Sequence, residues 1–163
     1  MLEAVIASFM IWISAHTGFV IPEPPDFSKR TEREIWNIVY SCDKNPKSNP
    51  CREPRGESGI VAIYNNRLKE IMVPMWFDLD KLSHRSILLH ELVHHLQYEN
   101  EYDEEVMCKA ELEKQAYDLQ DLWLKENKAV LSKGLEIGPL LRYTVTTCDE
   151  MQGWGQGWSP IPD

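Results

Sequence analysis

Two histidines and a glutamate with the spacing of a metal-binding helix stand out in the segment 83–97, SHRSILLHELVHHLQ. His90 and His94 are four residues apart, which places their side chains about 40° apart on one face of an α-helix. Both imidazoles can therefore converge on one metal ion. Glu91 lies at the edge of the same face, where it can reach a water bound to that ion. The H-E-x-x-H pattern thus predicts a zinc helix.

The opposite side of this helix is apolar, because Leu88, Leu92 and Leu96 lie away from both histidines. An H-E-x-x-H pattern can also arise by chance on an amphipathic helix, with its histidines at the surface or in the core. The leucines favour the metal site, since a chance match need not place them opposite the histidines. His95 is turned about 100° from His94, so we expect it to support a ligand or to lie at the surface.

The composition is that of one folded domain. With 163 residues and 43% hydrophobic residues, among them six tryptophans, the chain is long and apolar enough to bury a core, which excludes disorder. The formal net charge of −9 argues against nucleic acid or an anionic membrane as the main partner. The composition does not indicate an oligomeric state.

The first fifteen residues are apolar, but they predict neither a membrane span nor an export signal. They are too few to cross a bilayer, and they contain Glu3 and no Lys or Arg. Their hydrophobic residues recur at helical spacing, which predicts a core helix over residues 1–15. The missing signal favours the cytoplasm over export.

Four cysteines leave the compartment open. Cys42 and Cys51 bracket a polar loop that a disulfide could close, and Cys108 and Cys148 are the other two cysteines. Four thiols allow three pairings, and the sequence does not choose among them. In the cytoplasm all four would stay reduced.

Before the zinc helix, the sequence predicts strands and one capped helix. A short strand is expected around Phe27, and Thr31 with Glu34 forms a capping box that opens a helix. The polar segment 41–58 predicts a loop. The apolar runs 59–64 and 68–73 flank a turn, which predicts a β-hairpin whose strand could hold an extended peptide across the metal.

After the zinc helix, which Asp80 or Ser83 could cap, a polar turn and a second long helix over 104–125 are expected. A last short helix or strand follows at 139–148. These elements predict an α+β fold with helices packed on a small sheet or hairpin. We expect one domain over 1–148, with its core at 59–148, and a Gly/Trp/Pro-rich tail over 149–163.

The third metal ligand should come from the second long helix, because a catalytic zinc usually has three protein ligands and one open position. Glu111 and Glu113 flank the apolar stripe of that helix on opposite sides. Glu113 has partly apolar neighbours and Glu111 has polar ones, so Glu113 is favoured. An antiparallel register about a turn near Asp103 admits both. Either glutamate could instead belong to a solvated helix face.

These motifs carry a family resemblance. H-E-x-x-H followed by a glutamate 19 residues after His94 resembles the gluzincin branch of zinc metallopeptidases, and the E-x-x-A pattern at 113–116 looks like the glutamate helix of small bacterial gluzincins. The chain is also similar to an uncharacterised family of small bacterial and phage zincin-like proteins. This similarity lies in the segments LLHELVHHLQ and ELEKQAYDLQDLWL, in a cysteine between them and in the earlier V-A-I-Y. The resemblance covers about residues 59–148. It implies a minimal zincin-like domain, one zinc ion and hydrolase activity, but no particular substrate.

The chain departs from that pattern at one position. Many gluzincins have an aspartate four residues after the ligand glutamate, where it orients a histidine. Here that position is Tyr117, and Asp118 follows it. Some other group, such as a backbone carbonyl, would have to set the histidine tautomers.

The chemistry expected from such a site is hydrolysis of a peptide bond. Zinc held by His90, His94 and Glu113 would activate a water, and Glu91 would take the proton of that water and pass it to the leaving nitrogen. A further donor must stabilise the oxyanion. The candidates for that donor are Tyr143, Tyr117, Arg142 and His95.

Two alternatives remain from the sequence. The domain could bind zinc without turnover and serve as an interaction or regulatory module, although zinc retention alone does not require Glu91. It could also be a latent peptidase whose tail over 149–163 lies in the cleft, whereas an ordinary mobile terminus explains the same composition.

Overall fold

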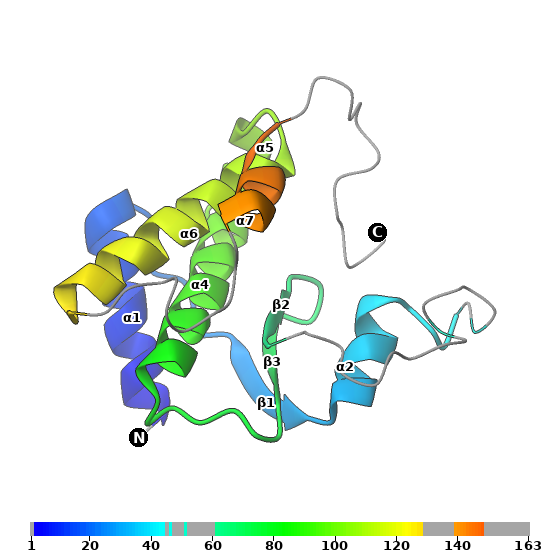
Figure 1. Ribbon diagram of the computed structural model, residues 1–163. Coiled ribbons are helices and arrows are strands. Elements are labelled where there is room, and N and C mark those ends of the chain that lie inside the picture. The colour runs from blue at the N-terminus through cyan, green and yellow to red at the C-terminus, as the bar shows by residue number, and fades with distance from the viewer. Residues whose placement is uncertain (1, 45, 47–50, 52–60, 129–138, 149–163) are drawn as a thin grey trace.

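The computed structural model describes residues 2–44, 46, 51, 61–128 and 139–148, which form helices beside a small sheet (Figure 1). This arrangement confirms the predicted α+β fold class. The chain runs through α1 (Leu2–Thr17), β1 (Asp26–Arg30), α2 (Glu32–Val39), β2 (Ile63–Asn65), β3 (Glu70–Pro74), α4 (Leu82–Glu99), α5 (Tyr102–Glu105), α6 (Lys109–Glu126) and α7 (Pro139–Thr146).

The sheet has three strands in the order β1-β3-β2. β2 and β3 pair antiparallel, with Tyr64 opposite Ile71, so the predicted hairpin is confirmed with a shorter first strand. β1 pairs parallel to β3, with Phe27 opposite Ile71, which confirms the strand expected there. β2 therefore lies at an edge of the sheet, on the side that contacts α4.

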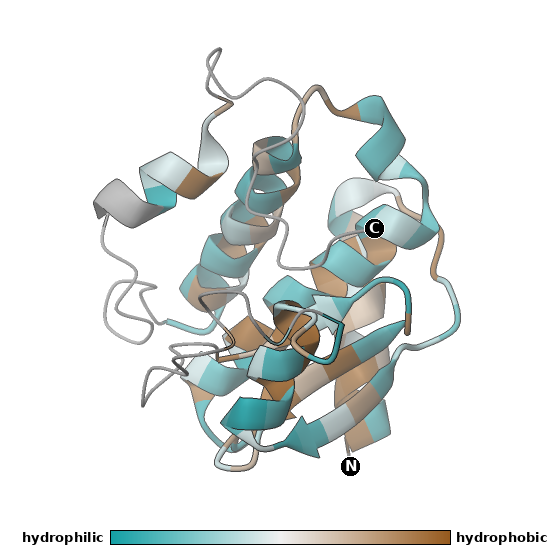
Figure 2. Ribbon diagram, turned by 90° about the vertical axis from the view of Figure 1, so that its right-hand side faces the viewer, coloured by the Kyte–Doolittle hydropathy of each residue, from teal (hydrophilic) through white to brown (hydrophobic). Residues whose placement is uncertain are grey.

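Helix α4 is the centre of the fold, because it contacts α1, α5, α6 and β2 (Figure 1). Its residues Leu88, Leu92 and Leu96 are fully buried, which confirms the predicted apolar side. Hydrophobic segments face inward where the helices pack against one another and against the strands, and hydrophilic segments lie outside (Figure 2). The helix that the sequence predicted to carry the zinc ligands is thus also the main helix of the hydrophobic core.

The N-terminal segment is a core helix, as its spacing predicted. Ile6, Phe9, Met10 and Ile13 of α1 are buried, and the ring of Phe9 meets the ring of Trp123 edge-on at 5.3 Å. Helix α1 therefore covers α4 and α6 from the side. Within the described ranges, no helix is long and apolar enough to cross a membrane.

The capping box at the start of α2 is confirmed. The hydroxyl of Thr31 accepts a hydrogen bond from the backbone N–H of Glu34, and the Glu34 carboxylate accepts one from the backbone N–H of Thr31. Burial of Ile35 and Val39 against Met72 then attaches α2 to the central strand β3.

The predicted cap of α4 is wrong, since the residue at the N-cap is Lys81 and not Asp80 or Ser83. The segment that precedes α4 is instead held against the first turn of the helix by the side chain of His84. The Nδ1 atom of the His84 ring accepts a hydrogen bond of 2.8 Å from the backbone N–H of Asp78. The His84 ring also stacks on Phe77, with 4.8 Å between ring centroids.

The second long helix begins at Lys109, five residues later than predicted. The residues expected in its first turn form the separate helix α5. Glu101, at the N-cap of α5, has a φ of 56°, and Val106 and Cys108 have extended backbone. The polar turn predicted after α4 is therefore partly helical, and an extended segment separates α5 from α6.

The cysteines pair as Cys42–Cys51 and Cys108–Cys148, so the structure makes the choice that the sequence left open. The segment 139–148 contains a helix, α7, and not a strand. The predicted tail over 149–163 and most of the predicted loop over 41–58 lie outside the described residues, and the domain boundary at 148 stays a prediction.

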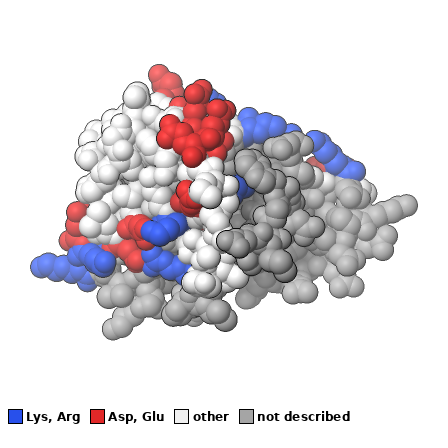
Figure 3. All heavy atoms as spheres, turned by 90° about the horizontal axis from the view of Figure 1, so that it is seen from above, with Lys and Arg blue, Asp and Glu red and all other residues white. Residues whose placement is uncertain are grey.

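A cluster of acidic side chains lies at one end of the molecule. Helix α5 contributes Asp103, Glu104 and Glu105 at the end drawn uppermost in Figure 1. The view from above shows acidic side chains gathered on this face (Figure 3).

Candidate metal centre

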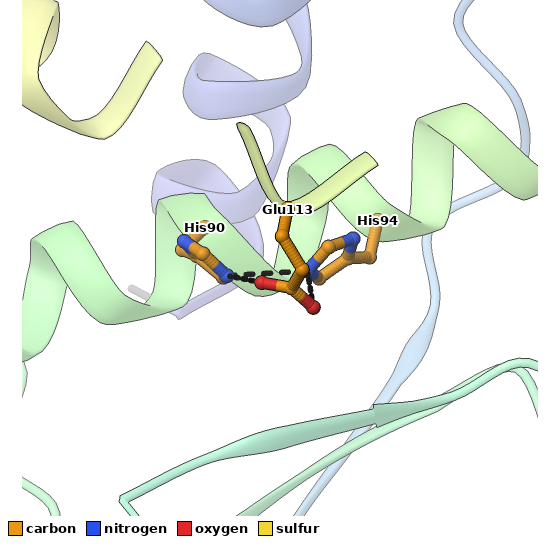
Figure 4. Close-up of side chains that lie close together, drawn as sticks. All are labelled: His90, His94 and Glu113. Atoms are coloured by element: carbon orange, nitrogen blue, oxygen red, sulfur yellow. Dashed lines mark hydrogen bonds and ion pairs between the residues drawn. The ribbon is translucent and has the colours of Figure 1, made fainter. Parts of the chain in front are cut away.

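Three ligand atoms from two helices converge at one point. His90 and His94 extend from α4, and Glu113 reaches between them from α6 (Figure 4). The Nε2 atoms of the two histidines are 3.1 Å apart. The Glu113 carboxylate places Oε2 3.3 Å from Nε2 of His90 and Oε1 3.4 Å from Nε2 of His94. These residues form a group that could hold a metal ion.

The spacing of these atoms fits a tetrahedral metal ion. Zinc binds histidine nitrogen and carboxylate oxygen at about 2.0–2.1 Å, and a tetrahedron with such bonds separates its ligand atoms by about 3.3–3.4 Å. The closest approaches between the three side chains are near this value, with 3.1 Å between the two Nε2 atoms and 3.3 and 3.4 Å from them to the two different oxygens of Glu113. Two imidazoles and a carboxylate suit zinc and other first-row divalent ions. The described residues therefore supply three possible ligands for one divalent ion.

The structure brings Glu113, and not Glu111, to the histidines. Glu113 belongs to the group that could hold an ion, whereas an oxygen of Glu111 lies 3.8 Å from Sγ of Cys148. Leu112 and Ala116 point into the core between α4 and α6. Glu113 follows Leu112 on the side of α6 that faces the histidines, as its partly apolar neighbours indicated.

His94 and Glu113 form an ion pair in this cluster. Burial lowers the pKa of His94, but the charge and hydrogen bond of Glu113, together with Glu91 and Gln97, outweigh that effect and raise the pKa to about 9. Burial raises the pKa of Glu113, yet the two histidines hold it well below its usual range. A proton on His94 thus occupies the place that a metal ion would take.

The histidines are supported by two side-chain amides that the sequence did not identify. Nδ1 of His90 lies 3.2 Å from Oε1 of Gln120, and Nδ1 of His94 lies 2.9 Å from Oε1 of Gln97. We expected some other group, such as a backbone carbonyl, to set the histidine tautomers in place of an aspartate. The direct partners of both rings are side-chain amides and not backbone carbonyls. The only signal in the sequence was helical spacing, since Gln97 is three residues after His94 and Gln120 is seven after Glu113.

Glu91 lies beside the site and contacts the edge strand. Its Oε2 atom accepts a hydrogen bond of 2.8 Å from the backbone N–H of Tyr64 in β2. Its negative charge is one of the causes that raise the pKa of His94, and it also raises the pKa of Tyr117. The carboxylate is thus close enough to act on groups around the metal position.

Among the predicted donors for an oxyanion, Tyr117 contacts the site directly. Its ring meets the ring of His90 edge-on at 4.5 Å between centroids. Burial, with the charges of Glu113 and Glu91, raises the pKa of Tyr117 to about 12, so its hydroxyl stays protonated at neutral pH. The Arg142 guanidinium lies 5.5 Å above the Tyr117 ring and forms ion pairs with Asp118 and Asp121.

The other two candidates are placed elsewhere. His95 is buried, and both of its ring nitrogens are engaged, one by the Tyr64 hydroxyl at 3.0 Å and one by the backbone carbonyl of Glu23 at 2.9 Å. Neither nitrogen is available to a substrate oxygen. Tyr143 is 65% exposed on α7. His95 therefore joins α4 to the hairpin and to the segment before β1.

A family model with the description "Domain of unknown function (DUF6647)" matches residues 3–135. The matched range includes the histidines, Glu91 and Glu113. No curated protein and no solved structure matches the chain.

Proposed function

The chain belongs to the DUF6647 family, and because that description assigns no activity, we propose a function from the geometry of the site. We propose that the protein is a zinc-dependent hydrolase that cleaves peptide bonds. The observation that carries the proposal is the position of Glu91 beside a cluster of three possible metal ligands. A structural zinc site is usually closed by four protein ligands, and it needs no carboxylate beside an open position. The resemblance to gluzincins supports the same reaction.

In this mechanism His90, His94 and Glu113 hold the ion and Glu91 moves the proton. Zinc, when bound, polarises the substrate carbonyl and lowers the pKa of the attacking water. Glu91 accepts a proton from that water and then donates it to the leaving nitrogen, so that the carbon–nitrogen bond breaks as an amine departs. The hydrogen bond from Tyr64 holds Glu91 in position for both transfers.

Tyr117 is the protein donor that best suits the developing oxyanion. It contacts His90 and keeps its proton at neutral pH, because its pKa is raised to about 12. A hydroxyl aimed at the position where negative charge develops is worth several kcal/mol in such sites, about 3–4 kcal/mol by analogy with oxyanion-hole donors. Arg142 acts through Tyr117, since its ion pairs with Asp118 and Asp121 hold it over the ring.

Strand β2 is the wall along which we expect an extended peptide to lie. It is an edge strand of the described sheet and contacts α4 beside the metal ligands. Edge strands bind extended peptides through main-chain hydrogen bonds, which accept many sequences. The substrate is therefore a peptide or a flexible protein segment and not a folded surface.

The two disulfides support a role in an oxidising compartment. Bonds such as Cys42–Cys51 and Cys108–Cys148 persist in secreted and periplasmic proteins and are rare in the cytoplasm of mesophiles. We therefore propose export, in place of the cytoplasmic location that we expected from the sequence. Thiol titration of protein taken directly from cells tests this, and four free thiols would contradict it.

Metal analysis of the untreated protein tests the proposed function first. We expect one zinc per chain, which is lost in His90→Ala. Hydrolysis of a mixed peptide library, read by mass spectrometry, should then depend on zinc and on Glu91. A protein that binds zinc but cleaves no peptide would be a binding module, whereas a protein without stoichiometric metal would contradict both interpretations.

A further inference from the structure

Both metal-binding imidazoles are supported from behind by buried glutamines. Gln97 and Gln120 are almost completely buried, and each presents its Oε1 atom to the Nδ1 atom of one histidine. A buried amide at such a position is informative, because the direction of its oxygen decides whether the ring nitrogen must donate or accept a proton.

The orientation of Gln97 is determined by the backbone of α6. The Gln97 side-chain nitrogen donates to the carbonyl oxygen of Leu112 at 3.0 Å and to Oε1 of Gln115 at 2.8 Å. A carbonyl oxygen can only accept, so the nitrogen of Gln97 must face Leu112 and its oxygen must face His94. Nδ1 of His94 therefore carries a hydrogen.

The orientation of Gln120 is determined in the same way through one intermediate group. The Ser86 hydroxyl donates to the carbonyl oxygen of Ser83 at 2.8 Å, which uses its only hydrogen. Its oxygen accepts from the Gln120 side-chain nitrogen at 3.1 Å. The Gln120 oxygen consequently faces His90, whose Nδ1 must donate.

We propose that Gln97 and Gln120 are positioning residues that keep a hydrogen on Nδ1 of His94 and of His90, so that Nε2 is the atom of each ring that is left to bind the metal. The proposal rests on the metal site of the proposed function. Each chain of hydrogen bonds ends at a backbone carbonyl, Leu112 in one and Ser83 in the other, which makes both tautomers properties of the fold.

The choice of amides has a chemical consequence. Metal-bound histidines commonly donate to a carboxylate, which makes the ring a stronger electron donor. An amide orients the ring without adding a charge. Glu113 is then the only anionic ligand of the cluster, and the bound ion keeps more of its positive charge for a substrate carbonyl.

Zinc affinity, measured by competition with a chelator, tests the proposal without any assay of activity. Gln120→Met and Gln97→Met remove the acceptor and keep the length of the side chain, and we expect each to weaken zinc binding about 10–100-fold. Gln120→Glu restores an acceptor opposite His90 and should recover binding to at least the level of the parent protein. Gln115→Met is the matched control, because Gln115 contacts Gln97 and neither imidazole; its effect should be the smallest.

Nitrogen-15 NMR of the imidazoles measures which ring nitrogen carries the hydrogen. This quantity would not depend on Gln97 and Gln120 if these residues only stabilised the fold. In the metal-free protein at alkaline pH, both histidines should show a protonated Nδ1, and in the zinc-loaded protein Nε2 should be the bound atom. A protonated Nε2 in the parent protein, or Met variants that bind zinc like the parent, would overturn the proposal. If the parent binds no zinc but both rings show protonated Nδ1, the tautomer assignment stands and the proposed function fails.

Discussion

The side chain of Glu91 and the backbone of Tyr64 are joined by a hydrogen bond of 2.8 Å between the carboxylate and the N–H. This contact connects α4, which carries the two candidate histidine ligands, to the edge strand β2. The proposed base is thus held by the same strand that we expect to hold the substrate. A peptide that pairs with β2 would be placed beside Glu91 and the metal at once.

Replacement of Glu91 by glutamine should separate catalysis from metal binding. The amide of Glu91→Gln still offers an oxygen to the Tyr64 N–H, so the fold and the metal site should be retained. Because the amide cannot accept the proton of water, we expect kcat to fall about 10²–10⁴-fold with unchanged zinc content. Steady-state kinetics and metal analysis measure the two effects. Glu99→Gln is the control on the same helix, since Glu99 pairs with Lys69 away from the ligands, and equal activity of both variants would remove Glu91 from the mechanism.

The identity of the third ligand can be tested with two glutamates of one helix. Glu113→Gln should abolish stoichiometric zinc and weaken affinity more than about 100-fold, beyond what the loss of a supporting hydrogen bond costs. Glu111→Gln should bind zinc like the parent, because Glu111 lies near Cys148 and not near the histidines. Chelator competition gives both affinities. A larger loss of zinc affinity in Glu111→Gln than in Glu113→Gln would assign the third ligand to Glu111.

The ligands of this site could be predicted because they depend on local periodicity. A four-residue spacing on one helix is sufficient to bring His90 and His94 together, and the leucines opposite them predicted which side of α4 is buried. Glu113 was harder to assign. An antiparallel register of the two helices about the turn near Asp103 is compatible with both Glu111 and Glu113 as the third ligand. Only the partly apolar neighbours of Glu113 favoured that residue.

The supporting contacts could not be predicted, because they depend on packing between helices. Gln120 reaches His90 only because α6 lies against α4, and its spacing of seven residues from Glu113 places it on the same side of α6 without indicating which atom it contacts. The N-cap of α4 was missed because the His84 ring, and not a capping side chain, fixes the connection before it. The start of α6 was missed because Val106 and Cys108 have extended backbone in a stretch whose composition suits a helix.

Zinc affinity should rise with pH. His94 has a pKa of about 9 in the metal-free protein, so metal must displace a proton from it at neutral pH. We expect affinity to rise about tenfold per pH unit up to about pH 9 and then to level off. Calorimetry in buffers of different ionisation enthalpy should detect about one released proton per zinc at pH 7. Binding without proton release would show that His94 is neutral in the free protein.

The same pKa gives the metal-free protein a stability that depends on pH. The folded pKa of His94 is raised above the unfolded value of 6.5, so its contribution is fully present below about pH 6.5 and is lost as pH rises through about 9. Thermal unfolding of the metal-free protein should therefore shift to lower temperature between pH 7 and pH 10. Metal-free His94→Asn should lose this part of the pH dependence, and a parent protein whose unfolding is insensitive to pH over this range would contradict the assignment.

The two disulfides should contribute unequally to stability. Cys108–Cys148 closes a sequence separation of 40 residues and Cys42–Cys51 one of 9. A crosslink lowers the entropy of the unfolded chain more when the loop is longer, so we expect losses of about 4 and about 3 kcal/mol in unfolding free energy for the two double Cys→Ser variants. Denaturant unfolding measures both losses. An equal or reversed order would show that the Cys108–Cys148 bond is strained or that unfolded-state effects dominate.

The Cys108–Cys148 variant should leave the metal site intact. The bond joins the residue before α6 to the residues after α7, whereas Glu113 is held against the histidines by the packing of α4 on α6. Zinc affinity of folded Cys108→Ser/Cys148→Ser should therefore stay within about twofold of the parent value. The Cys42→Ser/Cys51→Ser variant, whose bond lies beyond α2, is the matched control. A large loss of affinity in the Cys108 variant alone would show that the position of Glu113 depends on α7, since that helix is the element which the bond attaches to α6.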